Sequence, residues 1–348
     1  MAAAIANWAP RFLANGVYPD DFERTTARIE TWDGWLDAWV ETADGHRLRA
    51  EGAEAEGNGL TAGEAYGAAA LCYHFAKFVW VVDADRNRET TGQAIACLYR
   101  AHSHLDPTAE RVEIPFADGP LVGNLRRPTG SERAPLVVLL AGLDSTKEEF
   151  FLWENVFLAR GMATFSFDGP GQGESGFATT IRPDYEAPVA AALDALGERD
   201  DVDLERVGAA GVSLGGYYAP RAGLEPRVRA VAGVSGPFDF GECWEGLPAL
   251  TRETFQHHSG AGDSEEARAK ADELDLADVI DEVDCPGLMV TGRLDRLIPW
   301  EQTKRIADRA PNMRFVLYEE GNHVCNNIPF KYRPLVADWL GKELAGVG

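Results

Sequence analysis

The sequence predicts an α/β protein with a mostly parallel, doubly wound sheet that follows a helical region. Two observations predict this class. Residues 135–140, PLVVLL, form a continuous apolar run, which is typical of a strand buried on both faces of a parallel sheet. After this run, short apolar segments alternate with amphipathic helical stretches, which is the pattern of parallel α/β sheets.

The expected strands of this sheet are short and rich in Val, Leu, Ala and Phe. They fall within residues 134–142, 161–169, 206–213, 228–236, 286–292 and 313–321. Ahead of them, residues 111–128 predict two further strands joined by a turn at Asp118-Gly119. One interval, at about residues 237–284, is helical and acidic without a clear strand. This interval is predicted to be a helical insertion over the sheet.

The chain before the sheet is predicted to be a separate helical domain, residues 1–110, followed by a sheet domain, residues 111–348. Trp32, Trp35 and Trp39 recur at i, i+3 and i+7, which places them on one face of a helix. Such a stripe could line a substrate pocket, but aromatic stripes at helical spacing are more often core. We therefore interpret these tryptophans as core residues of the helical domain.

The composition is that of a globular protein, with 45% hydrophobic and 26% charged residues. A formal net charge of −23 argues against nucleic acid or an anionic membrane as a partner, because both would repel the chain. The N-terminus lacks the basic region of a signal peptide, and no apolar run approaches the length of a membrane span. We expect a cytoplasmic protein without a membrane partner.

No metal and no cofactor is expected. The five cysteines are scattered, and none forms a C-x-x-C pair, which argues against a disulfide framework or a cysteine-based zinc site. The segment 168–175, DGPGQGES, has some likeness to a phosphate-binding loop, but it lacks the lysine of such loops. Pro170 also breaks a dinucleotide-binding pattern. We interpret the segment as a turn packed beneath a functional site.

The chemistry of the chain is expected to centre on Ser213. It occupies the middle of a G-x-S-x-G pentad in the segment 211–216, GVSLGG. An apolar strand precedes the pentad and a helical stretch follows it, which is the setting of a nucleophile elbow. A serine hydroxyl is a weak nucleophile at neutral pH, so a base must accept its proton and a third group must orient that base.

Two residues that follow later strands are candidates for these roles. Asp295, in VTGRLDRLIP, comes just after one strand, and His323, in LYEEGNHVC, comes just after the next. The carboxyl ends of parallel strands meet at one edge of a sheet, so the fold can bring both side chains to Ser213. The order serine, acid, histidine is also the chain order that this elbow requires.

An oxyanion formed at this serine would need two backbone N–H donors. One is expected from Leu214, directly after the nucleophile, and the other from Leu143, in the turn after the first buried strand. Asp144 and Lys147 follow in the same turn. They could contact the substrate, but capping of the turn is an equally supported role.

These motifs together resemble the α/β-hydrolase family that contains 2,6-dihydroxypseudooxynicotine hydrolase and the fermentation–respiration switch-like (DUF1100-type) hydrolases. The resemblance extends from Pro135 to Leu344 and more weakly into the helical region. It is carried by the blocks GLDSTKEE, GMATFSFDGPGQGES, GVSLGG, GRLDRLIP and EEGNHVCNN. It implies an α/β-hydrolase fold and a homodimeric serine hydrolase, with Ser213 as nucleophile, Asp295 as orienting acid and His323 as base.

Several members of this family cleave a carbon–carbon bond next to a ketone through an acyl-enzyme. The resemblance therefore implies a small-molecule substrate with an activated carbonyl, of the β-diketone or acyl-aryl ketone type. A carboxylesterase or lactonase with the same triad is the alternative, because only protonation of the leaving group differs. A third hypothesis is a binding or regulatory protein that has this fold but no catalytic activity. The intact triad argues against it.

The inserted segment holds the residues that could decide between these substrates. The nicotine-pathway members carry an additional active-site glutamate there, and the matching position in this sequence is Leu247, with Glu245 close by. Trp244 and these two residues are candidate substrate contacts. A structural or solvent-facing role is equally compatible with the sequence.

Overall fold

The structure is a computed structural model, and it describes residues 2–130, 133–197 and 199–346. It divides into two compact units. The helical unit contains the residues up to Ala109 together with Glu148–Leu152, and the sheet unit contains Glu110–Lys147 and the chain from Trp153 onward. The segment Glu148–Leu152 lies within the range that the sequence assigned to the sheet domain.

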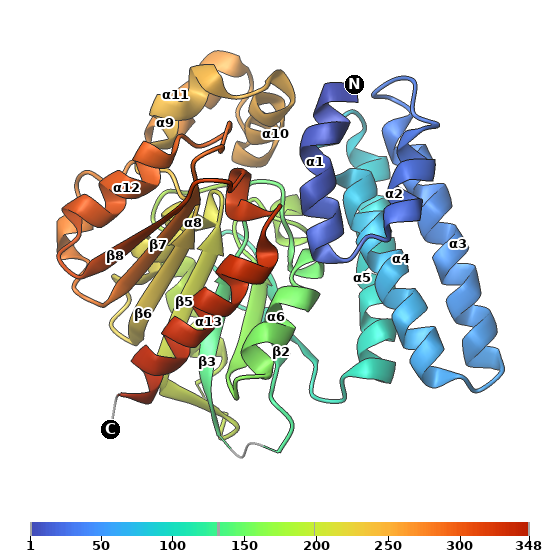
Figure 1. The fold of residues 1–348 in the computed structure, drawn as a ribbon, viewed down its shortest axis with the longest axis horizontal. Helices are drawn as coiled ribbons and strands as arrows, with labels where there is room; N and C mark the ends of the chain where they lie inside the picture. Colours follow the sequence, from blue (N-terminus) through green and yellow to red (C-terminus); the bar gives the residue numbers. More distant parts are fainter. Residues whose placement is uncertain (1, 131–132, 198, 347–348) are drawn as a thin grey trace. The chain divides into compact units, whose positions relative to one another are not determined.

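The helical unit is built on helices (Figure 1). Their buried side chains form a core rich in aromatic residues. Trp35 and Trp39 are fully buried, and the indole N–H of Trp35 donates to the carbonyl of Phe75 at 3.0 Å. The interpretation of the tryptophan stripe as core is confirmed for these two residues. The helices are α1 Ala2–Asn15, α2 Pro19–Thr26, α3 Trp35–Ala55, α4 Gly59–Lys77 and α5 Ala84–Leu105.

The sheet unit contains an eight-stranded sheet in the order β1-β2-β4-β3-β5-β6-β7-β8. Strands β1 and β2 are antiparallel to their neighbours, and all the other pairs are parallel. This topology confirms the predicted fold class. The strands are β1 Glu110–Ile114, β2 Leu121–Arg126, β3 Ala134–Leu140, β4 Ala163–Asp168, β5 Val202–Val212, β6 Val228–Val234, β7 Gly287–Gly292 and β8 Met313–Tyr318.

Helices cover both faces of this sheet. A Cβ atom at Gly208 of β5 would lie 3.0 Å from the side chain of Leu340 in α13, whereas one at Gly211 would lie 1.9 Å from Gly215 in α8. Positions three apart on a strand face opposite sides, so α13 and α8 cover opposite faces. In Figure 1, α13 crosses the face turned toward the viewer. The helices outside the insertion are α6 Phe151–Leu158, α7 Glu186–Ala195, α8 Gly215–Ala222, α12 Trp300–Arg309 and α13 Pro329–Ala345.

The interval between β6 and β7 is helical, as the sequence predicts. It contains α9 Phe240–Cys243, α10 Ala249–Ser259 and α11 Ser264–Asp272, and one isolated antiparallel bridge joins Asp239 to Asp275. Short 3₁₀ turns complete the structure at Lys147–Glu149, Ser175–Phe177, Trp244–Gly246, Ile280–Glu282 and His323–Cys325. Within the described ranges, none of the helices combines the length and apolar character needed to cross a bilayer.

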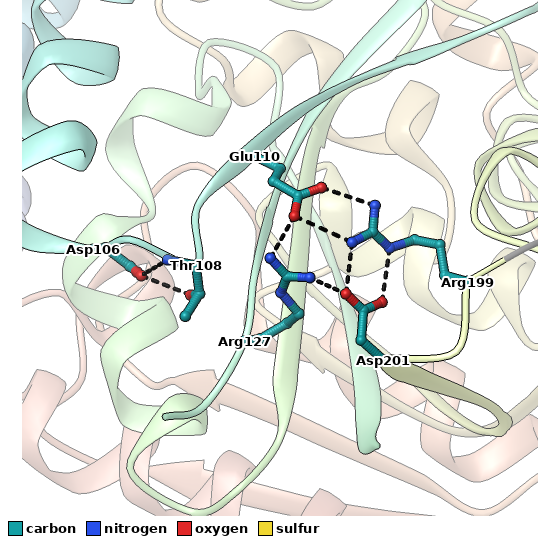
Figure 2. A network of polar contacts seen from close by, with 6 residues as sticks. All are labelled: Asp106, Thr108, Glu110, Arg127, Arg199 and Asp201. Atoms are coloured by element: carbon teal, nitrogen blue, oxygen red, sulfur yellow. Dashed lines mark hydrogen bonds and ion pairs between the residues drawn. The ribbon is translucent and has the colours of Figure 1, made fainter. Parts of the chain in front are cut away.

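Charged side chains tie the antiparallel edge of the sheet to its centre (Figure 2). Arg199 Nη1 donates to Glu110 at 2.8 Å and Arg199 Nη2 donates to Asp201 at 2.7 Å. Arg127 also pairs with both of these carboxylates. The four groups join the start of β1 and the residue after β2 to the turn before β5. Since all four are partly exposed, we expect the network to fix the geometry more than to raise the stability.

Candidate active site

Ser213 lies on a sharp turn between β5, which ends at Val212, and α8, which begins at Gly215. Its backbone is left-handed, with φ 57°, which is a strained conformation for a residue with a side chain. The neighbouring glycines make the turn possible. A Cβ atom at Gly211 would lie 1.9 Å from the carbonyl oxygen of Gly215, and one at Gly215 would lie 2.2 Å from that of Leu140.

The structure brings Ser213, His323 and Asp295 into one hydrogen-bonded chain. His323 Nε2 lies 3.0 Å from Ser213 Oγ, and His323 Nδ1 lies 2.8 Å from Asp295 Oδ2. The side chain of Asp295 is fully buried and that of His323 is 20% exposed. The three residues follow β5, β7 and β8 at the carboxyl edge of the sheet.

The loop after β7 fixes the carboxylate of Asp295. Its Oδ1 accepts the backbone N–H groups of Leu297 at 2.9 Å and Ile298 at 3.0 Å. These bonds occupy one carboxylate oxygen and turn the other, Oδ2, toward His323. Asp295 Oδ2 is therefore placed to accept the Nδ1–H of the histidine.

The loop that carries His323 is strained, and a residue directly after β6 holds it. Val324 and Cys325 both have left-handed backbones, with φ 58° and 54°, and a β-branched residue adopts this conformation only under constraint. The N–H of Val324 donates to Ser235 Oγ at 3.0 Å. Ser235, directly after β6, is itself left-handed and donates its own N–H to Val290 of β7 at 2.8 Å. Ser235 was not among the site residues predicted from the sequence.

The predicted oxyanion donors belong to two segments, the elbow itself and the loop after β3. Leu214 is the residue before the first turn of α8, and Leu143 follows β3; both side chains are buried. Between β3 and Leu143, a Cβ atom at Gly142 would lie 3.0 Å from Ser213 Cβ and 3.1 Å from the carbonyl oxygen of Val212. The loop after β3 therefore lies directly against the elbow.

The side chain of Lys147 forms buried ion pairs with two carboxylates. Its ammonium is fully buried and lies 2.8 Å from both Asp168 Oδ2 and Glu174 Oε1. Asp168 Oδ1 also accepts the backbone N–H of Lys147 at 2.9 Å. Of the two roles that the sequence left open, the structure supports the structural one for Lys147. Asp144 is half-buried in the same loop.

The candidate substrate contacts of the insertion are divided between core and surface. Trp244 and Leu247 are buried in the apolar core, where the Trp244 ring packs edge-on against Phe255 with centroids 5.7 Å apart. The side chain of Glu245 is 87% exposed and lies 3.9 Å from Arg252. Glu245 therefore pairs with a residue of its own insertion. Across the described residues, no cluster of three or more His, Cys, Asp or Glu side chains is arranged to hold a metal ion.

A model of the FrsA-like esterase family matches residues 28–239, which is more than half of the chain. The chain belongs to the FrsA-like family of α/β-hydrolases. A model of the prolyl oligopeptidase family also matches residues 148–346, which span most of the sheet unit of this FrsA-like hydrolase. The predicted membership of the α/β-hydrolases is confirmed, and so is the prediction that the protein is a hydrolase.

Individual proteins resemble the FrsA-like hydrolase over much or nearly all of its length. It is 34% identical to the 2,6-dihydropseudooxynicotine hydrolase of Paenarthrobacter nicotinovorans, over 97% of this chain and 94% of the relative. A crystal structure of a 2,6-dihydroxy-pseudo-oxynicotine hydrolase superposes with a TM-score of 0.88 over 97% of this chain and 96% of the other. The hydrolase LUC6 of a Fusarium species is 36% identical over 62% of this chain and 55% of its own length.

Proposed function

We propose that this FrsA-like hydrolase works through an acyl-enzyme on Ser213, with His323 as general base and Asp295 as the group that orients it. The hydrogen-bonded chain from Ser213 Oγ through both ring nitrogens of His323 to Asp295 carries the proposal. A histidine held by a buried carboxylate on one side and a serine hydroxyl on the other is arranged to move a proton between serine and a leaving group.

In the first half of the reaction, Ser213 Oγ adds to the substrate carbonyl while its proton moves to His323 Nε2. The carbonyl oxygen becomes an oxyanion, which the N–H groups of Leu143 and Leu214 would stabilise. The tetrahedral intermediate then collapses, and His323 returns the proton to the leaving group. In the second half, His323 activates a water molecule that releases the acyl group as a carboxylate.

We infer that the bond broken is a carbon–carbon bond next to a ketone, in a β-diketone or an acyl-aryl ketone. Full-length similarity to 2,6-dihydropseudooxynicotine hydrolase supports this substrate class. The electron pair of the broken bond passes to the leaving carbon and is delocalised as an enolate or into the ring. Because His323 Nε2 lies 3.0 Å from Ser213 Oγ, the proton that it takes from the serine can pass to this carbon.

A paired assay tests the function. Wild type and Ser213→Ala are given an aryl β-diketone and a p-nitrophenyl acyl ester, and the products are identified by mass spectrometry. Faster cleavage of the diketone, lost in Ser213→Ala, is the expected result. An inert diketone with fast ester cleavage would make the protein a carboxylesterase or lactonase. Turnover that survives in Ser213→Ala would contradict the triad.

We further infer that the hydrolase is a cytoplasmic homodimer that acts on small molecules and not on nucleic acid. The family resemblance supports the dimer, and the net charge of −23 supports the absence of a nucleic-acid partner. Light scattering after gel filtration tests the dimer, since one chain has a mass of 37.9 kDa.

A further inference from the structure

Gln172 is a buried polar residue beneath the elbow, and the mechanism described above does not use it. Only 1% of its surface is exposed. Its Nε2 donates to two consecutive carbonyl groups in the loop after β3, those of Ala141 at 2.9 Å and Gly142 at 2.7 Å. Its Oε1 accepts the N–H of Gly169 at 2.9 Å and the hydroxyl of Tyr185 at 2.9 Å.

The orientation of this side-chain amide follows from its partners. Two carbonyl oxygens can only accept, so they require the NH₂ group, and the N–H of Gly169 can only donate, so it requires the oxygen. A flipped amide would place donor against donor and acceptor against acceptor. All the strong hydrogen-bonding directions of the amide are used, which makes Gln172 a rigid link between two loops.

One of these bonds controls a peptide group at the oxyanion site. The carbonyl of Gly142 and the N–H of Leu143 belong to the same planar trans peptide, so they point in opposite directions. Holding the carbonyl on the side of Gln172 turns the N–H of Leu143 to the other side. Gly142 itself lies against Ser213, since its Cβ position is 3.0 Å from Ser213 Cβ.

We propose that Gln172 is a positioning residue that aims the Leu143 N–H at the developing oxyanion. The proposal rests on the proposed function, because it needs a tetrahedral intermediate on Ser213. A glycine at position 142 cannot hold the peptide by side-chain packing, and its backbone is free to rotate unless hydrogen bonds restrain it. Gln172 supplies that restraint from a fixed place.

The place is fixed because the turn that carries Gln172 is tightly packed. A Cβ atom at Gly169 would lie 1.9 Å from the hydroxyl of Tyr185, and Gly171 has φ 76°. The ring of Tyr185 stacks on that of Tyr218 of α8 with centroids 3.7 Å apart. The anchor of the loop after β3 is therefore part of the packed core beneath α8.

Substitution of Gln172 tests the proposal through the amide donors. Gln172→Met keeps the length of the side chain and removes both N–H donors and the acceptor, whereas Gln172→Glu, protonated in this buried site, keeps the acceptor and one O–H donor. Ser175→Ala is the matched control, because Ser175 lies in the same turn but binds the N–H of Val122 of β2 instead. Circular dichroism and thermal melting select the folded variants.

For each folded variant, kcat and KM are measured together with the inhibition constant of an alkyl trifluoromethyl ketone, which forms a hemiketal oxyanion with the serine. In Gln172→Met we expect kcat to fall by about 100-fold, the loss typical of one missing oxyanion donor, with KM changed less than about threefold. Affinity for the ketone falls with kcat. Gln172→Glu is intermediate, and Ser175→Ala resembles wild type.

Three results would overturn the proposal. These are an unchanged kcat in folded Gln172→Met, a loss of kcat without a loss of affinity for the trifluoromethyl ketone, and an equal loss in Ser175→Ala. If Gln172→Met does not fold, Gln172→Glu is judged by the same criteria. A fluorophosphonate that fails to modify Ser213 in the wild type would refute the proposed function itself, which separates that failure from the failure of the role of Gln172.

Discussion

Ser235 holds the backbone next to His323. Its hydroxyl accepts the N–H of Val324, the residue after His323, within a left-handed stretch of backbone. In Ser235→Ala this buried N–H loses its acceptor, which costs about 1–3 kcal/mol, and the strained loop loses a restraint. We expect kcat to fall about tenfold with little change in KM. Steady-state kinetics check this result, and an unchanged kcat would show that the other bonds of the loop suffice.

The residues predicted from sequence and those that were missed differ in what determines them. Short motifs at the ends of strands mark Ser213, Asp295 and His323. Their order along the chain predicts which is the nucleophile, which the acid and which the base. Gln172 and Ser235 act through loops that are distant in sequence. Gln172 bonds to a carbonyl 31 residues away and Ser235 to an N–H 89 residues away. No local pattern encodes such pairings, because they depend on which strands become neighbours.

At the scale of elements, the elbow depends on the close approach of α8 to β3. A Cβ atom at Gly215 would lie 2.2 Å from the carbonyl oxygen of Leu140. This oxygen belongs to the backbone of β3 and cannot move aside as the end of a flexible side chain could. We expect Gly215→Ala to lower the free energy of unfolding by about 1–3 kcal/mol or more, and to reduce activity by displacing Ser213. Urea unfolding and kinetics measure both effects.

Gly52→Ala is the control for this substitution. Gly52 lies inside α3, and nothing approaches its Cβ position within 4 Å. Alanine there raises helix propensity, so we expect the stability to rise by about 0.5–1 kcal/mol. A similar loss of stability in both variants would contradict the argument from close approach.

Among the elements, the strands and the helical insertion could be predicted from the sequence, but the assignment of one short segment to its unit could not. Buried parallel strands appear in the sequence as apolar runs, and the helical insertion appears as an interval without such a run. The membership of Glu148–Leu152 in the helical unit was not predictable. These residues follow β3 directly, and nothing in their composition separates them from the loops of the sheet.

For the molecule as a whole, acid stability is expected to depend on a buried cluster in the helical unit. Glu149 accepts hydrogen bonds from Arg11 at 2.7 and 2.6 Å and from Asn15 at 2.6 Å, and it lies 3.1 Å from His74. Burial by itself would raise the pKa of Glu149, but the charge and hydrogen bonds of Arg11 hold it well below its usual value. Burial, together with the nearby charge of Lys77, lowers the pKa of His74.

Both shifts have the same consequence for the dependence of stability on pH. Because both groups bind protons more readily when unfolded, the free energy of unfolding should fall as the pH drops through about 6.5 and again through about 4.3. Glu149→Gln removes the carboxylate, so we expect a loss of about 3 kcal/mol at neutral pH and a shallower decline below pH 5. Melting temperatures measured between pH 8 and pH 4 check this result; parallel curves for wild type and variant would contradict it.

The discontinuity of the helical unit limits how the protein can be divided. The chain leaves the helical unit after Ala109 and forms β1, β2 and β3 of the sheet unit. It then returns to the helical unit for Glu148–Leu152 and continues in the sheet unit from Trp153. A cut near residue 110 would therefore not detach a module. It would leave Glu148, Glu149 and Phe150, all nearly buried, attached to the wrong fragment. Recombination between relatives can exchange the unit intact only if both of its segments move together.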